Sequence, residues 1–492
     1  MAYKHGIYTT EKDTKMPDPA ITEAGVQVIF GTAPVNLADD PSAAANTPLL
    51  IQTMEDAQKK LGYSEYCDWN QYTLCQSIYC CFKMIPVAPV VFVNVLDPSK
   101  HKATAASTEM TVTKKQCTIT DESGNVFGVI KSSVAVKASS SGSALVEGED
   151  YITSFDAYGN CVITLLDDGD AASATSVYVS YDKLDPSAVT ENDIIGGNNN
   201  GVETGMELIR KVFPMFGITA GLILAPGWSH KPVVSAVMET KCALINGCFK
   251  SECIVDVDST SSGATTYTAV DAKKKAAGLI SPHTLAYWPM VEKNGHRMHM
   301  SALMGALITN KDISNDDVPY KSPSNTKISV DAVVLADGTK VVLDQEQGNV
   351  VNAAGVSTII NFGGFRSWGN NTAAYPDQTD PVKRWINVRR FFTWWANNFV
   401  KRYMDRVDGV PNKALIDSIV DEENMRCNGY VSRGYCAGAR IAFNNAKSDV
   451  VNGALAFTAT LTPFPPAENI EVDIEFSVDN LQSYYAAMGG EE

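Results

Sequence analysis

Histidine is scarce in this sequence of 492 residues, with six copies in all. No set of histidine, carboxylate and nucleophile in it has the spacing of a catalytic motif. The glycine-rich stretch at residues 196–201 is not followed by the lysine and serine or threonine of a phosphate-binding loop, so it indicates a turn. We therefore expect no catalytic residue and no cofactor, which argues against an enzyme.

Metal-binding patterns are also missing from the sequence. His296 and His299 stand three residues apart in a predicted helix, but the glutamate of a zinc hydrolase does not accompany them. The cysteines number 11, which is odd, and no two of them form a C-x-x-C pair. We expect no metal site and interpret the cysteines as reduced thiols, mostly buried, in a cytoplasmic environment.

Long apolar runs and an excess of positive charge are absent too. The N-terminal stretch lacks the apolar core of a secretion signal. The longest apolar stretch, residues 74–96, is interrupted by Lys83, Pro86 and Pro89, which predicts a helix followed by a buried strand. The net charge of −16 is unsuited to general nucleic-acid binding. We expect neither membrane insertion nor direct contact with nucleic acid.

The patterns that are present predict a multidomain protein of the α+β or α/β class. Helical and strand patterns alternate before residue 100 and again after residue 200, whereas the intervening stretch has short strand-like runs separated by turns. This predicts a discontinuous core domain built from both chain ends, a small inserted all-β domain and a middle α/β domain. The predicted segments are an N-terminal arm (1–20), the first part of the core (21–100), the inserted β-rich domain (101–192), the middle domain (193–345), the second part of the core (346–467) and a C-terminal arm (468–492).

Charge is segregated towards the C-terminal end. Residues 384–406 predict one long helix with an apolar stripe, and Lys383, Arg390 and Lys401 fall opposite that stripe. Residues 381–406 contain seven Lys or Arg and a single acidic residue, Asp405, whereas residues 468–492 contain seven acids and no Lys or Arg. These charges form either two solvated faces or complementary surfaces of neighbouring subunits.

The segment 470–478 alternates without exception and predicts a strand. Its apolar positions are Ile470, Val472, Ile474, Phe476 and Val478. A long apolar strand near a chain end has exposed edges unless another strand pairs with it. The partner is either a strand of the same chain or the sheet of a neighbouring subunit, as in strand addition.

Several segments resemble one protein family. GGFRSWGNNT (363–372) resembles the signature segment of contractile phage tail sheath proteins, and LTPFPPAENIEV (461–472) resembles the strand, proline loop and strand with which that family ends. LDPSAVTENDIIGG (184–197) and LILAPGWS (222–229) also resemble segments of long sheath proteins. The similarity extends in pieces from about residue 184 to residue 478, and the first 100 residues share the layout more than the motifs.

The resemblance implies a structural subunit that polymerises helically around an inner tube and contracts, in a virion or phage-tail-like particle assembled in the host bacterial cytoplasm. Its implied partners are further copies of the chain, the inner tail tube protein, and baseplate and tail terminator proteins. Ile470, Val472, Ile474, Phe476 and Val478 would form a donated strand, and Tyr3, Ile7 and Tyr8 would belong to an N-terminal arm. Lys383, Arg390 and Lys401 would face the tube or an acidic neighbour, whereas Arg366 and Trp368 would be core residues of the signature turn.

Two other classes stay open at this point. One is a different structural component of a virion or baseplate. The other is an α/β enzyme with an inserted β domain, for which a coherent pocket of acid, base and nucleophile would be diagnostic.

Overall fold

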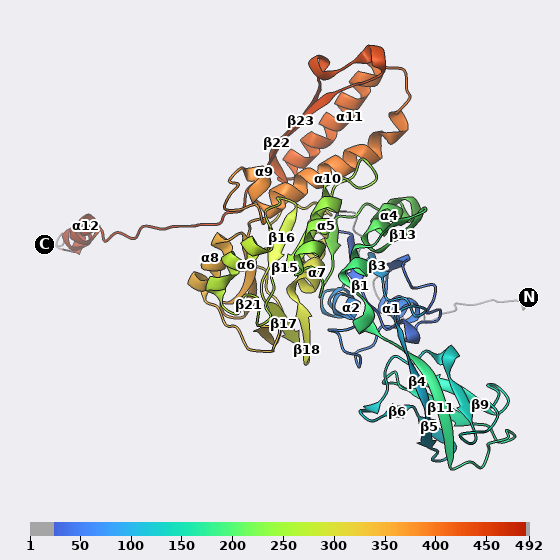
Figure 1. Cartoon of the computed structure of the whole chain (residues 1–492). Helices are drawn as coiled ribbons and strands as arrows, with labels where there is room; N and C mark the ends of the chain where they lie inside the picture. The colour runs from blue at the N-terminus through green and yellow to red at the C-terminus, as the bar shows by residue number, and fades with distance from the viewer. Residues whose placement is uncertain (1–23, 489–492) are drawn as a thin grey trace, which may run out of the picture.

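The computed structural model describes residues 24–488, and one sheet of eight strands lies at its centre (Figure 1). In spatial order the strands are β2 (Pro48–Ile51), β3 (Val90–Asn94), β1 (Gln27–Gly31), β14 (Leu222–Leu224), β15 (Glu252–Asp256), β16 (Thr284–Tyr287), β20 (Val356–Asn361) and β21 (Phe365–Trp368). Strands β3 to β20 pair in parallel, whereas β2 and β21 are antiparallel at the two edges. Strands β1, β3, β14 and β15 are buried along their whole lengths, which explains their apolar runs without alternation.

This sheet confirms a mixed α/β class, but its composition differs from the predicted layout. Strands of the segment 193–345 stand between those of 21–100 and those of 346–467. We expected the middle segment to form a domain of its own. Its strands instead join the two parts of the predicted core within one sheet. The physical reason is that successive strand–helix units with parallel crossovers extend a sheet that already exists.

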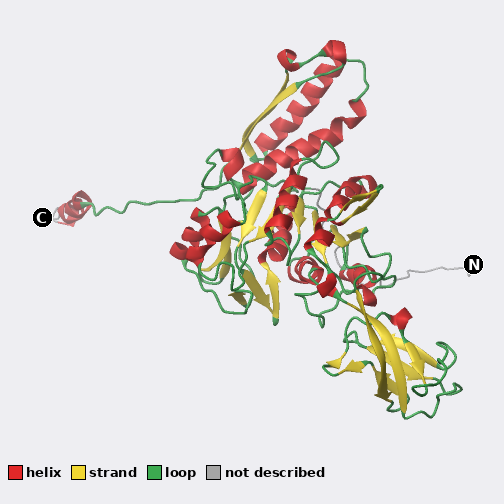
Figure 2. Ribbon diagram, viewed as in Figure 1, coloured by secondary structure: helices red, strands yellow, loops and turns green. Residues whose placement is uncertain are grey.

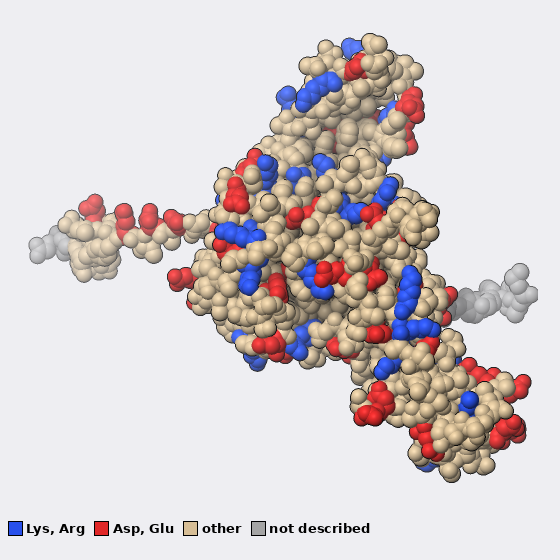
Figure 3. Space-filling model, viewed as in Figure 1, with Lys and Arg blue, Asp and Glu red and all other residues tan. Residues whose placement is uncertain are grey.

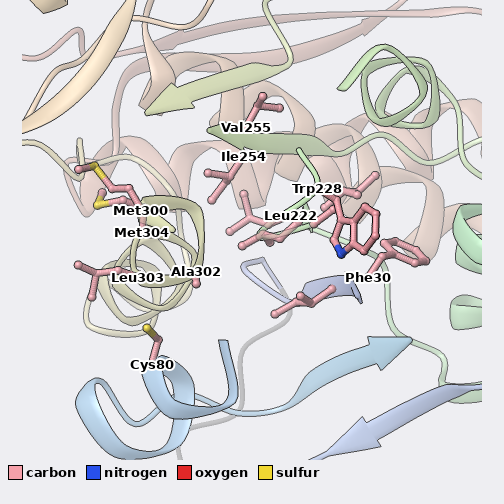
Figure 4. Close-up of a cluster of buried hydrophobic side chains, with 14 of the residues drawn as sticks. Phe30, Cys80, Leu222, Trp228, Ile254, Val255, Met300, Ala302, Leu303 and Met304 are labelled. Carbon is pink, nitrogen blue, oxygen red and sulfur yellow. The ribbon is translucent and has the colours of Figure 1, made fainter. Parts of the chain in front are cut away.

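Helices pack around the sheet and close a continuous core. They are α1 (Met54–Leu61), α2 (Leu74–Tyr79), α3 (Glu191–Ile195), α4 (Ile209–Phe216), α5 (Pro232–Ala243), α6 (Val270–Ala276), α7 (Met300–Ile313) and α8 (Gln345–Ala353). Both α5 and α7 contact β14 and β15, and α2 contacts α7. Figure 4 shows part of this core, in which Leu222, Ile254 and Leu303 have no exposed surface. Among residues 24–488, no helix is both long enough and apolar enough to cross a bilayer.

Residues 102–184 form a β-rich unit that projects from the body (Figure 2). Its strands are β4 (Lys102–Thr111), β5 (Gln116–Thr118), β6 (Thr120–Asp121), β7 (Gly124–Asn125), β8 (Ala135–Lys137), β9 (Tyr151–Phe155), β10 (Cys161–Leu165) and β11 (Ser176–Leu184). Two three-stranded sheets, β5-β10-β9 and β4-β11-β8, enclose a hydrophobic cluster of their own that includes Val136, Ile163 and Val177. The long strands β4 and β11 pair with each other and connect the unit to the body.

Two smaller groups of strands flank the central sheet. One is the hairpin of β12 (Gly197–Asn199) and β13 (Val202–Thr204), and the other is the sheet of β17 (Met290–Lys293), β18 (His296–His299) and β19 (Ala332–Val334). The glycine-rich stretch 196–201 lies in the first of these, as part of a hairpin, in agreement with the predicted turn.

The C-terminal lobe packs two long helices against a hairpin. It contains α9 (Pro381–Arg384), α10 (Ile386–Tyr403), α11 (Lys413–Ser432), β22 (Cys436–Phe443) and β23 (Phe457–Pro463), and α12 (Val478–Met488) follows beyond it. The single helix predicted for 384–406 is interrupted, because Trp385 has an extended backbone (φ −87°, ψ 126°). The side chain of Asn412 caps α11, and the helix continues through Gly429. Tyr430 then packs in the lobe's own cluster with Phe391 and Trp395.

Candidate assembly surfaces

Residues 464–488, which we call the arm, leave the body after β23. They run away from the lobe without a strand until α12 begins at Val478 (Figure 1). The nine-residue strand that the alternation predicts at 470–478 is thus absent from the single chain, and its last residue belongs to a helix. A strand needs a partner for its backbone groups, and the described residues supply none at this place.

The apolar side chains between residues 470 and 476 of the arm are almost fully exposed to solvent. Ile470 is 86% exposed, Val472 80%, Ile474 91% and Phe476 78%. Their carboxylate neighbours line the arm in Figure 3. This alternation of apolar and acidic side chains is typical of a strand that buries one face. Within the described residues, no surface of the same chain covers the apolar face of this segment.

The start of the arm is fixed to the lobe. Arg384 donates from Nη2 to Glu468 Oε2 at 2.8 Å and from Nε to Asn371 Oδ1 at 2.8 Å. The guanidinium also stacks 3.9 Å from the ring centre of Trp385. Asn387 Nδ2 donates to the carbonyl of Phe464 at 2.9 Å. These contacts set the direction in which the arm departs.

The hairpin of β22 and β23 has one edge that α11 occupies and one that is open. Asn424 of α11 accepts a hydrogen bond from Ile441 N and donates one to Ile441 O, each at 2.9 Å, so this point of the β22 edge is satisfied. Ile441 lies opposite Ala459, whose corresponding groups therefore face the other side of the hairpin. In the part of the chain that the structure describes, no strand pairs with β23 on that side.

The predicted basic stripe does not exist as one surface. Arg390 is 3% exposed and makes two bonds to Asp312 of α7, from Nη1 at 2.9 Å and from Nη2 at 2.5 Å. Burial raises the pKa of the Asp312 carboxyl, and the charge of Arg390 acts in the opposite direction. The expectation that Arg390 is exposed is wrong, because this part of α10 packs against α7 of the body, where Asp312 pairs with Arg390. Lys383 is exposed on α9, and Lys401 is half-buried near the end of α10.

The remaining predicted residues are distributed as follows. Tyr3, Ile7 and Tyr8 lie outside the described residues. His296 and His299 lie in β18 and not in a helix. The His296 ring stacks on Trp69 at 3.8 Å, and Gln76 Oε1 accepts a hydrogen bond from the backbone N of His299 at 2.8 Å and lies 3.1 Å from its ring Nδ1. Within residues 24–488 no group of three or more histidine, cysteine or acidic side chains is arranged to hold a metal ion.

All the cysteines are unpaired thiols. Ten of them are buried and Cys248 is exposed. This agrees with the interpretation of the cysteines as mostly buried thiols, and it leaves one position on the surface with a reactive group.

The signature segment 363–372 forms β21 and the turn after it, at the edge of the central sheet. Arg366 and Trp368 are both half-exposed. Trp368 packs against the edge of the main hydrophobic core and donates from Nε1 to Asn349 at 2.9 Å, whereas Arg366 bonds to Asn325 and is not the core residue that we predicted. Gly369 has φ +144°, and a Cβ there would lie 2.3 Å from Ser357 Oγ. The segment thus shapes the wall of a polar cavity of about 750 Å³, which residues 466–470 of the arm also line.

A multidomain body with an extended, unpartnered arm and an open hairpin edge is typical of a subunit that assembles with other chains. The chain is a homologue of phage tail sheath proteins. It is 26% identical to the tail sheath protein of Burkholderia phage BcepMu over 97% of this chain and 98% of the relative. It is 27% identical to the tail sheath protein of Escherichia phage P2 over 58% of this chain and 70% of that protein. These relatives confirm the resemblance found in the sequence. No family model matches the chain.

Solved structures share the fold over nearly the whole chain. The sheath of an extracellular contractile injection system in its contracted state (PVC) has a TM-score of 0.57 at 13% identity, covering 98% of this chain and 99% of that one. The sheath tail protein of Desulfitobacterium hafniense has a TM-score of 0.51 at 10% identity, covering 93% of this chain and all of that one. At these identities the likeness concerns the fold alone.

Proposed function

We propose that this protein is the structural subunit of a contractile tail sheath, which polymerises helically around an inner tube and contracts to drive the tube through a cell envelope. The observation that carries the proposal is the similarity to a phage tail sheath protein over 97% of this chain and 98% of the relative. A match that spans both chains end to end includes the body, the β-rich unit and the arm. The protein is then a component of a virion or phage-tail-like particle, assembled in the host cytoplasm, and its work is mechanical rather than enzymatic.

The arm is the proposed link between subunits. In our proposal residues 470–477 of one copy add as a strand to the open edge of β23 in a neighbour. Strand β23 alternates Phe457, Ala459 and Leu461 with exposed threonines, so the added strand would continue an apolar face over the lobe. Backbone hydrogen bonds and half of the four apolar side chains would together contribute on the order of 5–10 kcal/mol to each link. The proposed N-terminal arm, with Tyr3, Ile7 and Tyr8, would add a further strand.

The contact with the inner tube is proposed to be electrostatic. Lys383 and Lys401 remain the basic residues that would face the tube or an acidic neighbour. A salt-screened, non-directional contact can hold a tube and release it when the sheath moves. Baseplate and tail terminator proteins would bind the two ends of the polymer, where a subunit has no neighbour.

The test is negative-stain electron microscopy of the purified full chain at increasing concentration, alone and with the inner tube protein. We expect hollow cylinders with helical striations. A chain that lacks residues 470–492 should stay monomeric under the same conditions, with an unchanged circular dichroism spectrum and melting temperature. Monomers of the full chain in both settings would contradict a sheath function, and normal cylinders from the shortened chain would contradict the arm as the link.

A further inference from the structure

Helix α12 at the end of the arm carries an apolar face that touches nothing in its own chain. Leu481, Tyr484, Tyr485 and Met488 follow the spacing i, i+3, i+4 and i+7, which places them on one side of a helix. They are 44%, 57%, 63% and 64% exposed. Asp479, Ser483 and Ala486 lie on the opposite side. A helix with this pattern in water is typical of a segment that docks into a groove of another protein.

A matching groove lies on the body. It is a cavity of about 860 Å³ between α4, the loop at residues 246–249 and the end of α10. Phe213, Phe249, Val400 and Met404 provide its apolar lining, and the rings of Phe213 and Phe249 are 4.6 Å apart. Met404 is 64% exposed. The size and the apolar lining suit an amphipathic helix that inserts a few large side chains.

The net charges of the C-terminal segment and of the groove lining are opposite in sign. Arg210 and Lys401 line the groove, and Glu203 is its acidic residue. Glu203 lies 3.8 Å from Arg210 and 3.9 Å from Lys211, so basic side chains outnumber it. The segment 468–492 has seven acids and no Lys or Arg. An acidic arm is therefore attracted to this side of the body.

The geometry selects a second copy as the occupant. In Figure 1 the arm leaves the body on the left, whereas α4 lies on the right, so α12 points away from the groove of its own chain. Residues 464–477 span at most about 50 Å when fully extended, so this segment is long enough to hold α12 well away from its own body. A contact between two different surfaces of identical chains is head-to-tail and generates rings or open helical polymers.

We propose that α12 of one copy docks, through Leu481, Tyr484, Tyr485 and Met488, into the groove between α4 and the end of α10 of a second copy. This inference rests on the proposed sheath assembly and adds a contact to it. The strand at 470–477 joins two subunits through backbone bonds, and α12 then fixes the far end of the arm. The groove also sets which face of the neighbour the arm crosses.

Cys248 makes the proposal directly testable, because it lines the groove and is the exposed cysteine. A short bis-maleimide should cross-link full-length Tyr485→Cys polymers into ladders through Cys248 of the next copy. The cross-linked fraction should exceed that of the unsubstituted chain about tenfold and fall to baseline in Tyr485→Cys with Cys248→Ser. Ser483→Cys, on the opposite side of α12, is the matched control and should stay near baseline. Equal ladders from the two cysteine positions, or none from Tyr485→Cys in well-formed polymers, would overturn the docking.

A second measurement separates this contact from the strand. Leu481→Asp should raise the protein concentration needed for polymerisation roughly tenfold, as expected for loss of one buried apolar side chain, and Ser483→Asp should leave it unchanged. Removal of residues 478–492 should act like Leu481→Asp, whereas removal of 470–492 should abolish polymers. If removal of 478–492 has no effect, the docking is wrong and the strand link stands. If the unsubstituted chain forms no polymers at all, the sheath function and the docking both fail.

Discussion

The central sheet and the arm both contain short segments rich in apolar residues that favour β-strands, but the surroundings of these side chains are opposite. Val28 and Phe30 of β1 have no exposed surface, whereas Ile474 of the arm is 91% exposed. Strands β3 and β14 pair with β1 on its two sides, but within residues 24–488 no strand pairs with the arm. The apolar residues of the sheet therefore stabilise the fold of one chain, and those of the arm are available for stabilising the contact between chains. Substitutions in the two regions should act on different measurements.

The largest expected effect concerns assembly. Val472→Asp combined with Ile474→Asp places two carboxylates where the donated strand would be buried. We expect a loss of about 5 kcal/mol or more per contact, equivalent to a thousandfold or greater rise in the concentration needed for polymerisation. Light scattering against concentration measures it. The melting temperature of the monomer should not change, and Asp473→Ser on the other face is the control. A lower melting temperature would mean that the arm belongs to the fold.

The second effect concerns the fold itself. Asp312→Ala leaves the Arg390 guanidinium buried without its partner and should lower the free energy of unfolding by about 3–5 kcal/mol, as measured with denaturant. Asp312→Leu with Arg390→Met removes both charges and should recover most of this loss. If Asp312→Ala unfolds like the unsubstituted chain, the ion pair contributes nothing to the attachment of α10.

The third prediction concerns the stability of the body, which we expect to decrease in acid because of a buried histidine. Burial lowers the pKa of His299 to about 4. The unfolded value is about 6.5, so protonation favours the unfolded chain, and stability should fall as the pH drops from about 6.5 towards 4, by up to about 3 kcal/mol. The groups that face His299 are Gln76, His230 and Asp258. Burial raises the pKa of the nearby Asp256 carboxyl, so its protonation favours the folded chain and opposes the effect of His299 as the pH falls. Unfolding curves across this range should flatten in His299→Gln, and equal slopes would contradict the assignment.

The smallest effect concerns the surface charges. Lys383→Glu should weaken binding of the inner tube protein by less than about 1 kcal/mol and only at low salt, because an exposed charge is screened. Co-sedimentation of tube with sheath at two salt concentrations measures it. Lys114→Glu, in the β-rich unit, is the control with the same change of charge. Identical binding by both variants would remove Lys383 from the tube-facing surface.

Much of the secondary structure could be predicted because it depends on local patterns. The buried strand predicted at the end of the stretch 74–96 is β3, and the turn predicted at 196–201 lies in the hairpin of β12 and β13. Helix α12 was missed, although Leu481, Tyr484, Tyr485 and Met488 have helical spacing. The alternation up to Val478 directed attention to a strand, and nothing in the sequence marked where the period changes from 2 to 3.6.

The candidate surfaces could be predicted only in part. Ile470, Val472, Ile474 and Phe476 are exposed on the arm, and their pattern alone singled them out. The position of Arg390 could not be predicted, because the Asp312 that pairs with it is 78 residues away in the chain. The hypothesis of a single basic stripe assumed one solvent face on α10, and that helix is covered on two sides.

By itself, the sequence determined the mixed α/β class, the kinship with phage tail sheath proteins and the chemistry of the arm, because periodicity, motifs and charge are written in consecutive residues. Only the tertiary structure decided that three segments share one sheet, that Arg390 is buried, that the open edge of the hairpin belongs to β23, and that α12 faces away from its own groove. Each of these depends on contacts between residues far apart in the chain, and the local sequence does not indicate which distant residues a side chain will contact.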